Sequence, residues 1–369
     1  RARRIGGGRA ARDSGAMSRV ARTALAATGV FAVSGAASGA LIDEYGGIAG
    51  ALEWVLRTLV VISAAVALAA AFVLVLRLRR RLRPRPLAWA ATMLAATGFL
   101  FFVVQPSVFA VYLTHLPTRR AVHDTDLGAA KQPVTLTTAS GPRVHGWYVP
   151  SRNGAAVAVM HGTGSNRLGV ADHARLLARH GYGVLLFDFR GHGESDGRST
   201  SLPSALQEDA DAALAYLRSR PDVRAGRIGA IGVSLGGEVA VHAVARRPEW
   251  RAAVLEGVQG GSPADMRASK PDPASYATLT ALYGLGRVLG GSAPPASNPD
   301  QIERIAPRPL LLLSSGQSTE ARANEEYQRR AGRTAALWNL PAARHAAALR
   351  TDPAGYERHV IGFLDRALR

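Results

Sequence analysis

The chain has 369 residues, no cysteine and a formal net charge of +18 at pH 7. The lack of cysteine excludes disulfides, thiolate nucleophiles and cysteine-ligated metals, and the scattered histidines lack metal-ligand spacing, so we expect neither metal nor cofactor. The basic excess surrounds apolar segments and does not follow an aromatic-studded face, which argues against a nucleic-acid partner.

The N-terminal third differs in composition from the rest of the chain. Residues 1–120 hold 16 of the 45 basic residues and four acidic ones. Residues 1–22 form a basic segment, and Met17 begins a stretch that resembles a translation start, so residues 1–16 are expected to lie outside the mature protein. The sharp change of composition near residue 115 predicts two unlike parts.

Residues 23–115 read as a membrane region. Two apolar runs predict spans at 58–76 and 87–106, because each is long enough to cross about 30 Å of hydrocarbon as a helix. The stretch 23–42 is also uncharged and is either a weak third span or a signal peptide. Six arginines in residues 77–85 mark the connecting loop as cytoplasmic. We therefore expect a multi-pass protein of the cell membrane whose following domain lies outside the cytoplasm.

Residues 125–369 change to short apolar runs alternating with helical patterns, which predicts βαβ units and a mostly parallel sheet with helices on both faces. The eight expected strands lie at 134–138, 144–149, 155–160, 183–188, 227–233, 252–257, 310–314 and 335–340. Helices are expected between most of them, including 170–180, 202–218, 235–245 and 354–368.

The strongest motif is the G-x-S-x-G at residues 232–236. An apolar strand precedes it and a helical pattern follows, which is the context that a nucleophile elbow requires. Such a turn projects its serine out of the sheet and needs small residues where strand and helix approach each other. Ser234 is therefore the predicted nucleophile.

Two further motifs complete a family resemblance. An apolar strand runs into His161-Gly-Thr-Gly, and a later one runs into Phe187-Asp-Phe-Arg-Gly-His-Gly-Glu-Ser. With the serine motif, these resemble the successive signatures of the α/β-hydrolase superfamily, most of all its esterase, dienelactone hydrolase and serine aminopeptidase branches. The resemblance implies an acyl-enzyme mechanism without a metal and a chain order of Ser, acid and His. It also implies oxyanion stabilisation by the backbone N–H groups of Thr163 and Leu235, whereas the His161 and His192 side chains are expected to be structural.

The remaining members of the triad follow from the same resemblance. The base is expected on a loop after the last strand, where His345 lies, whereas the competitor His359 falls inside the terminal helix. Relatives usually carry an aspartate after the seventh strand. Here that loop has none, so Glu320 is the expected acid and Glu256, at the end of the sixth strand, is the alternative.

Residues 258–305 form an insertion with one expected helix at 274–288, either a lid over an acyl pocket or a surface excursion. The leading hypothesis is a serine hydrolase (carboxylesterase, thioesterase or peptidase-like) that acts on a small-molecule or lipid-like acyl substrate. The alternatives are an acyltransferase that uses the same site and a catalytically inactive membrane binding module. The oligomeric state is left open.

Overall fold

The computed structural model describes residues 85–115, 121–268 and 273–368. Of the two units into which the chain divides, Arg1–Leu56 lies wholly outside these residues, and Arg57–Arg369 contains them. The basic segment at 1–22 and the spans expected at 23–42 and 58–76 therefore lie outside the described residues.

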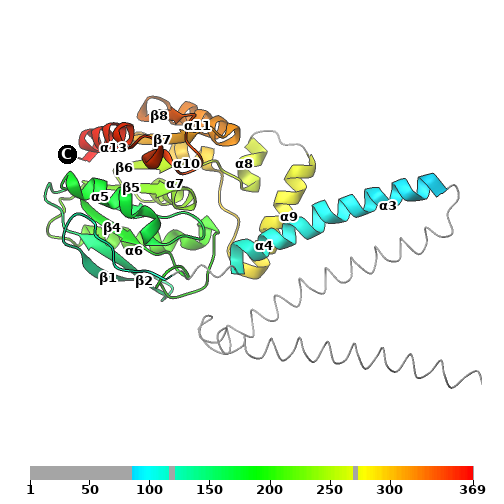
Figure 1. Cartoon of the computed structure of the whole chain (residues 1–369), viewed down its shortest axis with the longest axis horizontal. Coiled ribbons are helices and arrows are strands. Elements are labelled where there is room, and N and C mark those ends of the chain that lie inside the picture. The colour runs from blue at the N-terminus through cyan, green and yellow to red at the C-terminus, as the bar shows by residue number, and fades with distance from the viewer. Residues whose placement is uncertain (1–84, 116–120, 269–272, 369) are drawn as a thin grey trace, which may run out of the picture. The chain divides into compact units, whose positions relative to one another are not determined.

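The described part begins with a long apolar helix, drawn in cyan in Figure 1. It comprises α3 (Arg85–Phe99), a π-helical turn η1 (Leu100–Val104) and α4 (Gln105–His115). Pro106 follows the π turn, as expected where a residue without an N–H interrupts the hydrogen-bond ladder. The stretch Thr92–Val111 is 20 residues long and mostly exposed, and it is the one helix of the described residues that is long and apolar enough to cross a membrane.

A mixed sheet of eight strands forms the body of the protein, as the sequence predicts. The strand order is β1-β2-β4-β3-β5-β6-β7-β8; β2 pairs antiparallel with both β1 and β4, and all other pairs are parallel. The strands are β1 (Gln132–Thr137), β2 (Arg143–Val149), β3 (Ala156–Met160), β4 (Gly183–Phe187), β5 (Ile228–Val233), β6 (Ala252–Glu256), β7 (Leu310–Ser315) and β8 (Ala335–Leu340).

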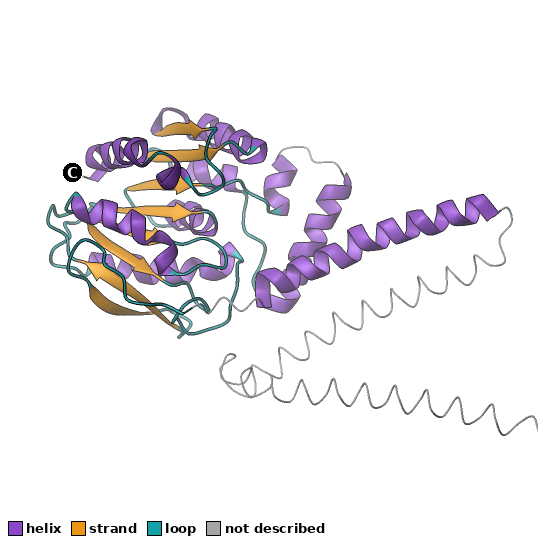
Figure 2. Ribbon diagram, viewed as in Figure 1, coloured by secondary structure: helices purple, strands orange, loops and turns teal. Residues whose placement is uncertain are grey.

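Helices cover both faces of this sheet (Figure 2). Neighbouring residues of the central strands alternate between two buried clusters, since successive side chains of a strand point to opposite faces. One face packs against α5 (Ala171–Arg179), α12 (Ala348–Thr351) and α13 (Pro353–Leu368). The other packs against η3 (Pro203–Leu206), α6 (Gln207–Arg218), α7 (Leu235–Arg246), α10 (Asn298–Ile305) and α11 (Ser318–Ala331). Short 3-10 turns, η2 (Arg167–Val170) and η4 (Gly332–Thr334), complete the elements.

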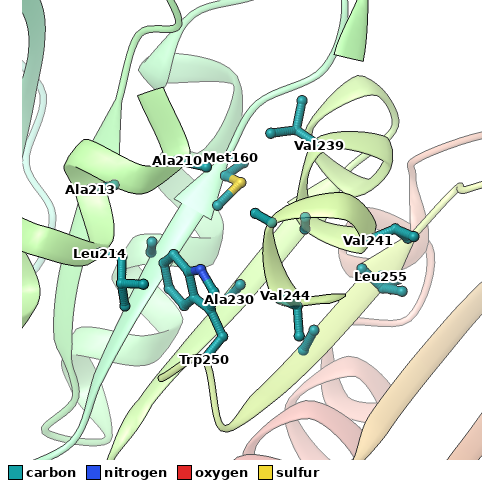
Figure 3. Packing of buried hydrophobic residues seen from close by; sticks show 14 of the residues in the cluster. Met160, Ala210, Ala213, Leu214, Ala230, Val239, Val241, Val244, Trp250 and Leu255 are labelled. Carbon is teal, nitrogen blue, oxygen red and sulfur yellow. The ribbon is translucent and has the colours of Figure 1, made fainter. Parts of the chain in front are cut away.

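Trp250 is the largest fully buried side chain among the described residues, and it lies where α6 and α7 meet the sheet. Figure 3 shows its ring beside Leu214 of α6, Ala230 of β5 and Val244 of α7. Small residues at Ala210, Ala213 and Ala230 leave room for this ring between the layers. Strand β5, which ends immediately before Ser234, is thus packed against this buried layer.

The insertion at 258–305 differs from the expectation, because its described residues form three helices where one was predicted. α9 (Pro273–Gly290) contains the expected helix, α8 (Pro263–Ala268) precedes it, and α10 follows. α8 and α9 pack on each other and α9 packs on α4, whereas Ile302 and Ile305 of α10 join the core of the sheet. α10 was missed because it is only eight residues long and opens with Asn-Pro-Asp, a sequence typical of a turn.

Candidate active site

Ser234 sits in a strained turn between β5 and α7. Its φ of 54° and ψ of −116° lie in a region that non-glycine residues rarely adopt. The glycines around it permit this turn: a Cβ on Gly236 would lie 2.2 Å from the carbonyl oxygen of Met160, and one on Gly232 would lie 2.3 Å from that of Gly236. These contacts give a steric reason for the small residues in the motif.

Ser234, His345 and Glu320 form one hydrogen-bonded chain. The Ser234 Oγ lies 2.9 Å from Nε2 of His345, and Nδ1 of the same ring lies 2.8 Å from Oε2 of Glu320. His345 follows β8, and Glu320 lies in the first turn of α11, after β7. The segments that follow β5, β7 and β8 thus bring these three side chains together.

The Glu320 carboxylate is fixed and ionised by its hydrogen bonds. Its side chain is buried, and Oε1 accepts the N–H of Ser315 at 2.6 Å. Burial raises the pKa of this carboxyl, but the hydrogen bonds from His345 and Ser315 outweigh it, and the pKa lies below its ordinary value. The same hydrogen bond to Glu320 raises the pKa of His345 above its usual value.

Glu256, the alternative acid, has different partners. Its Oε1 accepts the N–H of Ala348 at 2.9 Å, and Oε2 lies 3.4 Å from Nε2 of His173. Ala348 lies three residues beyond His345, so this buried carboxylate anchors the loop that carries the imidazole. Glu256 therefore helps to position His345 and does not contact the imidazole in the way that Glu320 does.

Thr163 and Leu235, whose N–H groups are the predicted oxyanion donors, line the same cavity as Ser234, which has a volume of about 250 Å³. Leu235 is the first residue of α7, and the first N–H groups of a helix have no intrahelical acceptor. Gly162 keeps the two loops close, since a Cβ there would lie 3.3 Å from the Cβ of Ser234.

The other motif histidines have structural partners. His161 is fully buried; its Nε2 accepts the N–H of Phe189 at 3.1 Å, and its Nδ1 lies 2.9 Å from the carbonyl oxygen of Gly162. Burial lowers the pKa of His161 to about 4, and that of His192, packed beside it, also to about 4. His359 stacks on Trp338, and its Nδ1 lies 2.8 Å from the carbonyl oxygen of Gly355 in its own helix.

A buried ion pair that the sequence did not reveal fixes the loop after β3. The Arg167 guanidinium lies 3.0 Å from Oδ2 of Asp188, and the Arg167 N–H donates to Oδ1 at 2.7 Å. Both side chains are almost inaccessible to solvent. In the sequence, the one sign of this ion pair is an arginine three residues after the Gly-Thr-Gly turn. Only the tertiary fold brings that arginine to Asp188.

Two carboxylates of the cavity were also missed. Glu238 and Asp265 both line it, and the backbone of the loop after β6 surrounds them. Glu238 accepts the N–H of Gly260 at 3.0 Å, and Asp265 accepts those of Gly261 and Ser262 at 3.0 and 2.9 Å. Burial raises the pKa of Glu238 to about 7. Among the described residues, no group of three or more His, Asp or Glu side chains is arranged to hold a metal ion.

The fold and this site together define an α/β-hydrolase. A family model described as serine aminopeptidase, S33, matches residues 151–335, which is half of the chain, and the chain belongs to this family of hydrolases.

Curated relatives share parts of this region. The chain is 39% identical over 122 residues to the uncharacterized protein Rv2307c of Mycobacterium tuberculosis and 30% identical over 190 residues to the uncharacterized protein YfhR of Escherichia coli. These matches cover 32% and 49% of this chain and 43% and 60% of the two relatives, so the chain spans about half the length of each. The thiohydrolase aneE of Aspergillus aculeatus is 33% identical over 114 residues, which cover 30% of this chain and 36% of that protein.

Solved structures share the fold. The Pyrococcus furiosus esterase Pf2001 matches with a TM-score of 0.58 and 24% identity, over 69% of this chain and 99% of that one. The α/β hydrolase GrgF of a Penicillium species matches with a TM-score of 0.53 and 19% identity, over 65% of this chain and 99% of that one. At these identities the similarity establishes the architecture.

Proposed function

We propose that the chain is a membrane-associated serine hydrolase that cleaves an ester, thioester or amide through an acyl-enzyme on Ser234. The observation that carries this proposal is the hydrogen-bonded chain from Ser234 Oγ through His345 to Glu320 at the edge of one cavity. The likeness to a thiohydrolase supports a thioester among the candidate substrates.

The chemistry follows from this geometry. His345 takes the proton of Ser234 through Nε2 while Oγ attacks the substrate carbonyl, and the N–H groups of Thr163 and Leu235 stabilise the oxyanion. The imidazolium then returns its proton to the departing alcohol, thiol or amine. Water repeats the sequence on the acyl-enzyme and releases the acid. Glu320 keeps Nδ1 protonated and stabilises the imidazolium.

Membrane association is part of the proposal and rests on the apolar helix. Its 20-residue stretch Thr92–Val111 is mostly exposed and leads directly into the hydrolase domain. Large apolar side chains such as Leu94, Val108 and Phe109 are exposed on it, an arrangement typical of a helix in contact with lipid. The basic loop that precedes it predicts that the hydrolase domain lies outside the cytoplasm.

Replacing Ser234 by Ala tests the reaction. We expect turnover of p-nitrophenyl butyrate to fall by about 10⁶-fold and labelling by a fluorophosphonate probe to disappear. The matched control is Ser219→Ala, an exposed serine at the end of α6 whose hydroxyl bonds only its own helix. Labelling that survives in the Ser234→Ala protein would refute the assignment, and transfer of the acyl group to an added acceptor in place of water would make the enzyme an acyltransferase.

A further inference from the structure

A second cavity adjoins the one that holds Ser234. It has a volume of about 400 Å³ and lies between α4 on one side and α8 and α9 on the other. Its walls are largely apolar and include Pro106 and Phe109 of α4, Met266 of α8, and Leu279 and Leu282 of α9. No member of the triad lines it, so its chemistry is that of binding and not of reaction.

Two features connect this cavity with the active site. Gly261 borders both cavities, and so does α4: Phe109 lines the apolar cavity, and Leu113, one helical turn further on, lines the cavity with Ser234. Residues one turn apart on a helix lie on the same face, so α4 provides a continuous apolar strip from the second cavity to the serine.

The position of α4 is set by contacts with the hydrolase domain. Ala110 and Thr114 of α4 are buried, and Gly290 of α9 approaches Thr114 so closely that a Cβ there would lie 3.1 Å from the Thr114 methyl group. The carbonyl oxygen of Leu113 accepts the N–H of Ser201 at 2.7 Å. The end of the apolar helix is therefore an integral wall of the site.

We propose that this second cavity binds the hydrocarbon chain of the acyl group, so that the substrate is a medium- or long-chain acyl ester or thioester whose tail lies between α4 and α9. This inference rests on the proposed hydrolase function and deepens it. A straight chain placed along α4 brings its carbonyl to Ser234 while its tail stays out of water. The polar side chains that line this cavity, Gln105, Ser275 and Thr278, carry no charge, so a charged acyl group finds no opposite charge in its walls.

The wall formed by α4 also indicates how the tail reaches the site. Phe109 and Val108 are adjacent on α4, and both are largely exposed at the edge of the stretch expected to contact lipid. An acyl chain taken from a bilayer and one carried in water have the same hydrocarbon tail and would bind the same walls. The last experiment below therefore compares these two sources directly.

The test measures chain-length selectivity of the full chain in lipid nanodiscs. We expect kcat/KM for p-nitrophenyl esters to rise from butyrate to dodecanoate by up to about fourfold for each methylene that becomes buried. Leu282→Gln, which places an amide in the cavity, should lower the dodecanoate-to-butyrate ratio at least tenfold. The matched control Val288→Gln, at an exposed position of the same helix, should leave that ratio unchanged.

A second readout keeps the inference separate from catalysis. The Ser234→Ala protein should bind the fluorescent fatty acid 11-(dansylamino)undecanoate saturably, in competition with dodecanoate, and Leu282→Gln should weaken this binding about tenfold. Turnover of butyrate with a flat chain-length profile, or binding that is equal in the Leu282→Gln and Val288→Gln proteins, overturns the acyl pocket. If the parent protein shows neither turnover nor labelling but still binds the fatty acid, the proposed hydrolase function is wrong and the proposed binding pocket is supported.

The two sources are separated by presenting the same chain in two ways. Dodecanoyl lysophospholipid embedded in the nanodisc supplies the tail from the bilayer, and dodecanoyl coenzyme A supplies it from water. Entry beside Phe109 predicts faster turnover of the embedded lipid, and Leu282→Gln should slow both. If Leu282→Gln slows the turnover of neither substrate, the second cavity is not the binding site of the tail.

Discussion

Replacing Glu320 by Gln is the sharpest test of the triad, because the structure shows which hydrogen bonds the amide could keep. The two carboxylate oxygens of Glu320 accept from the Ser315 N–H and from Nδ1–H of His345. Glutamine has one acceptor oxygen and one donor group. If its oxygen keeps Ser315, its NH₂ faces Nδ1 and selects the tautomer with the proton on Nε2, which then cannot accept the proton of Ser234.

The expected loss of catalytic rate is therefore the loss caused by holding His345 in the wrong tautomer. We expect kcat to fall by about 10⁴-fold, which corresponds to about 5 kcal/mol of transition-state stabilisation. Glu256→Gln is the matched comparison, because its oxygen can still accept from Ala348 while its NH₂ donates to Nε2 of His173. That variant should retain activity within about tenfold of the parent.

The assay is steady-state hydrolysis of p-nitrophenyl butyrate by the purified chain, together with the rate of fluorophosphonate labelling and a melting curve for each variant. The melting curves separate loss of chemistry from loss of fold. If Glu320→Gln keeps more than a tenth of the parent kcat, or if Glu256→Gln loses as much as Glu320→Gln, the assignment of the acid is wrong.

Two further outcomes follow from the electrostatics. His345 must be neutral to accept a proton, and its hydrogen bond to Glu320 raises its pKa above the usual value of 6.5. The activity of the parent protein should therefore fall with decreasing pH, with a midpoint above 6.5. In a pH–rate profile, the residual activity of Glu320→Gln should show a lower midpoint than the parent. Arg167→Leu leaves the buried Asp188 without its cation and should destabilise the fold by about 3–5 kcal/mol. This appears as a fall in Tm of roughly 6–20 °C for a domain of this size, and a Tm within 2 °C of the parent would contradict it.

The sheet was predictable because its signals are local. The strands from β3 to β8 are largely apolar runs, and runs that alternate with amphipathic segments allow few arrangements other than a parallel sheet. The elbow at Ser234 was equally local, since the two flanking glycines show where strand and helix must approach closely. Glu320 was expected because the family resemblance places an acid after the seventh strand and the loop there has no aspartate, and Glu256 remained the alternative.

The missed features depend on tertiary pairing. Arg167 and Asp188 are 21 residues apart and carry no pattern that joins them, yet the fold buries them together. α10 is short and its buried residues become apparent only when the sheet stands beside it. Likewise, the packing of α9 on α4 joins segments more than 150 residues apart, so the run at 87–106 gave no sign that the helix it begins would border a catalytic cavity.

The loop that separates the two cavities connects these local and tertiary features. Gly260 and Gly261 adopt positive φ values, and their N–H groups donate to the carboxylates of Glu238 and Asp265, respectively. The N–H of Asn298 on α10 donates to Asp265 as well, at 2.6 Å. The carboxylates thus tie this loop to α7 and α10, which pack on the sheet, while α4 and α9 close the opposite wall. In the proposed reaction, the body of the domain positions the reacting carbonyl, and the two apolar helices α4 and α9 select the tail.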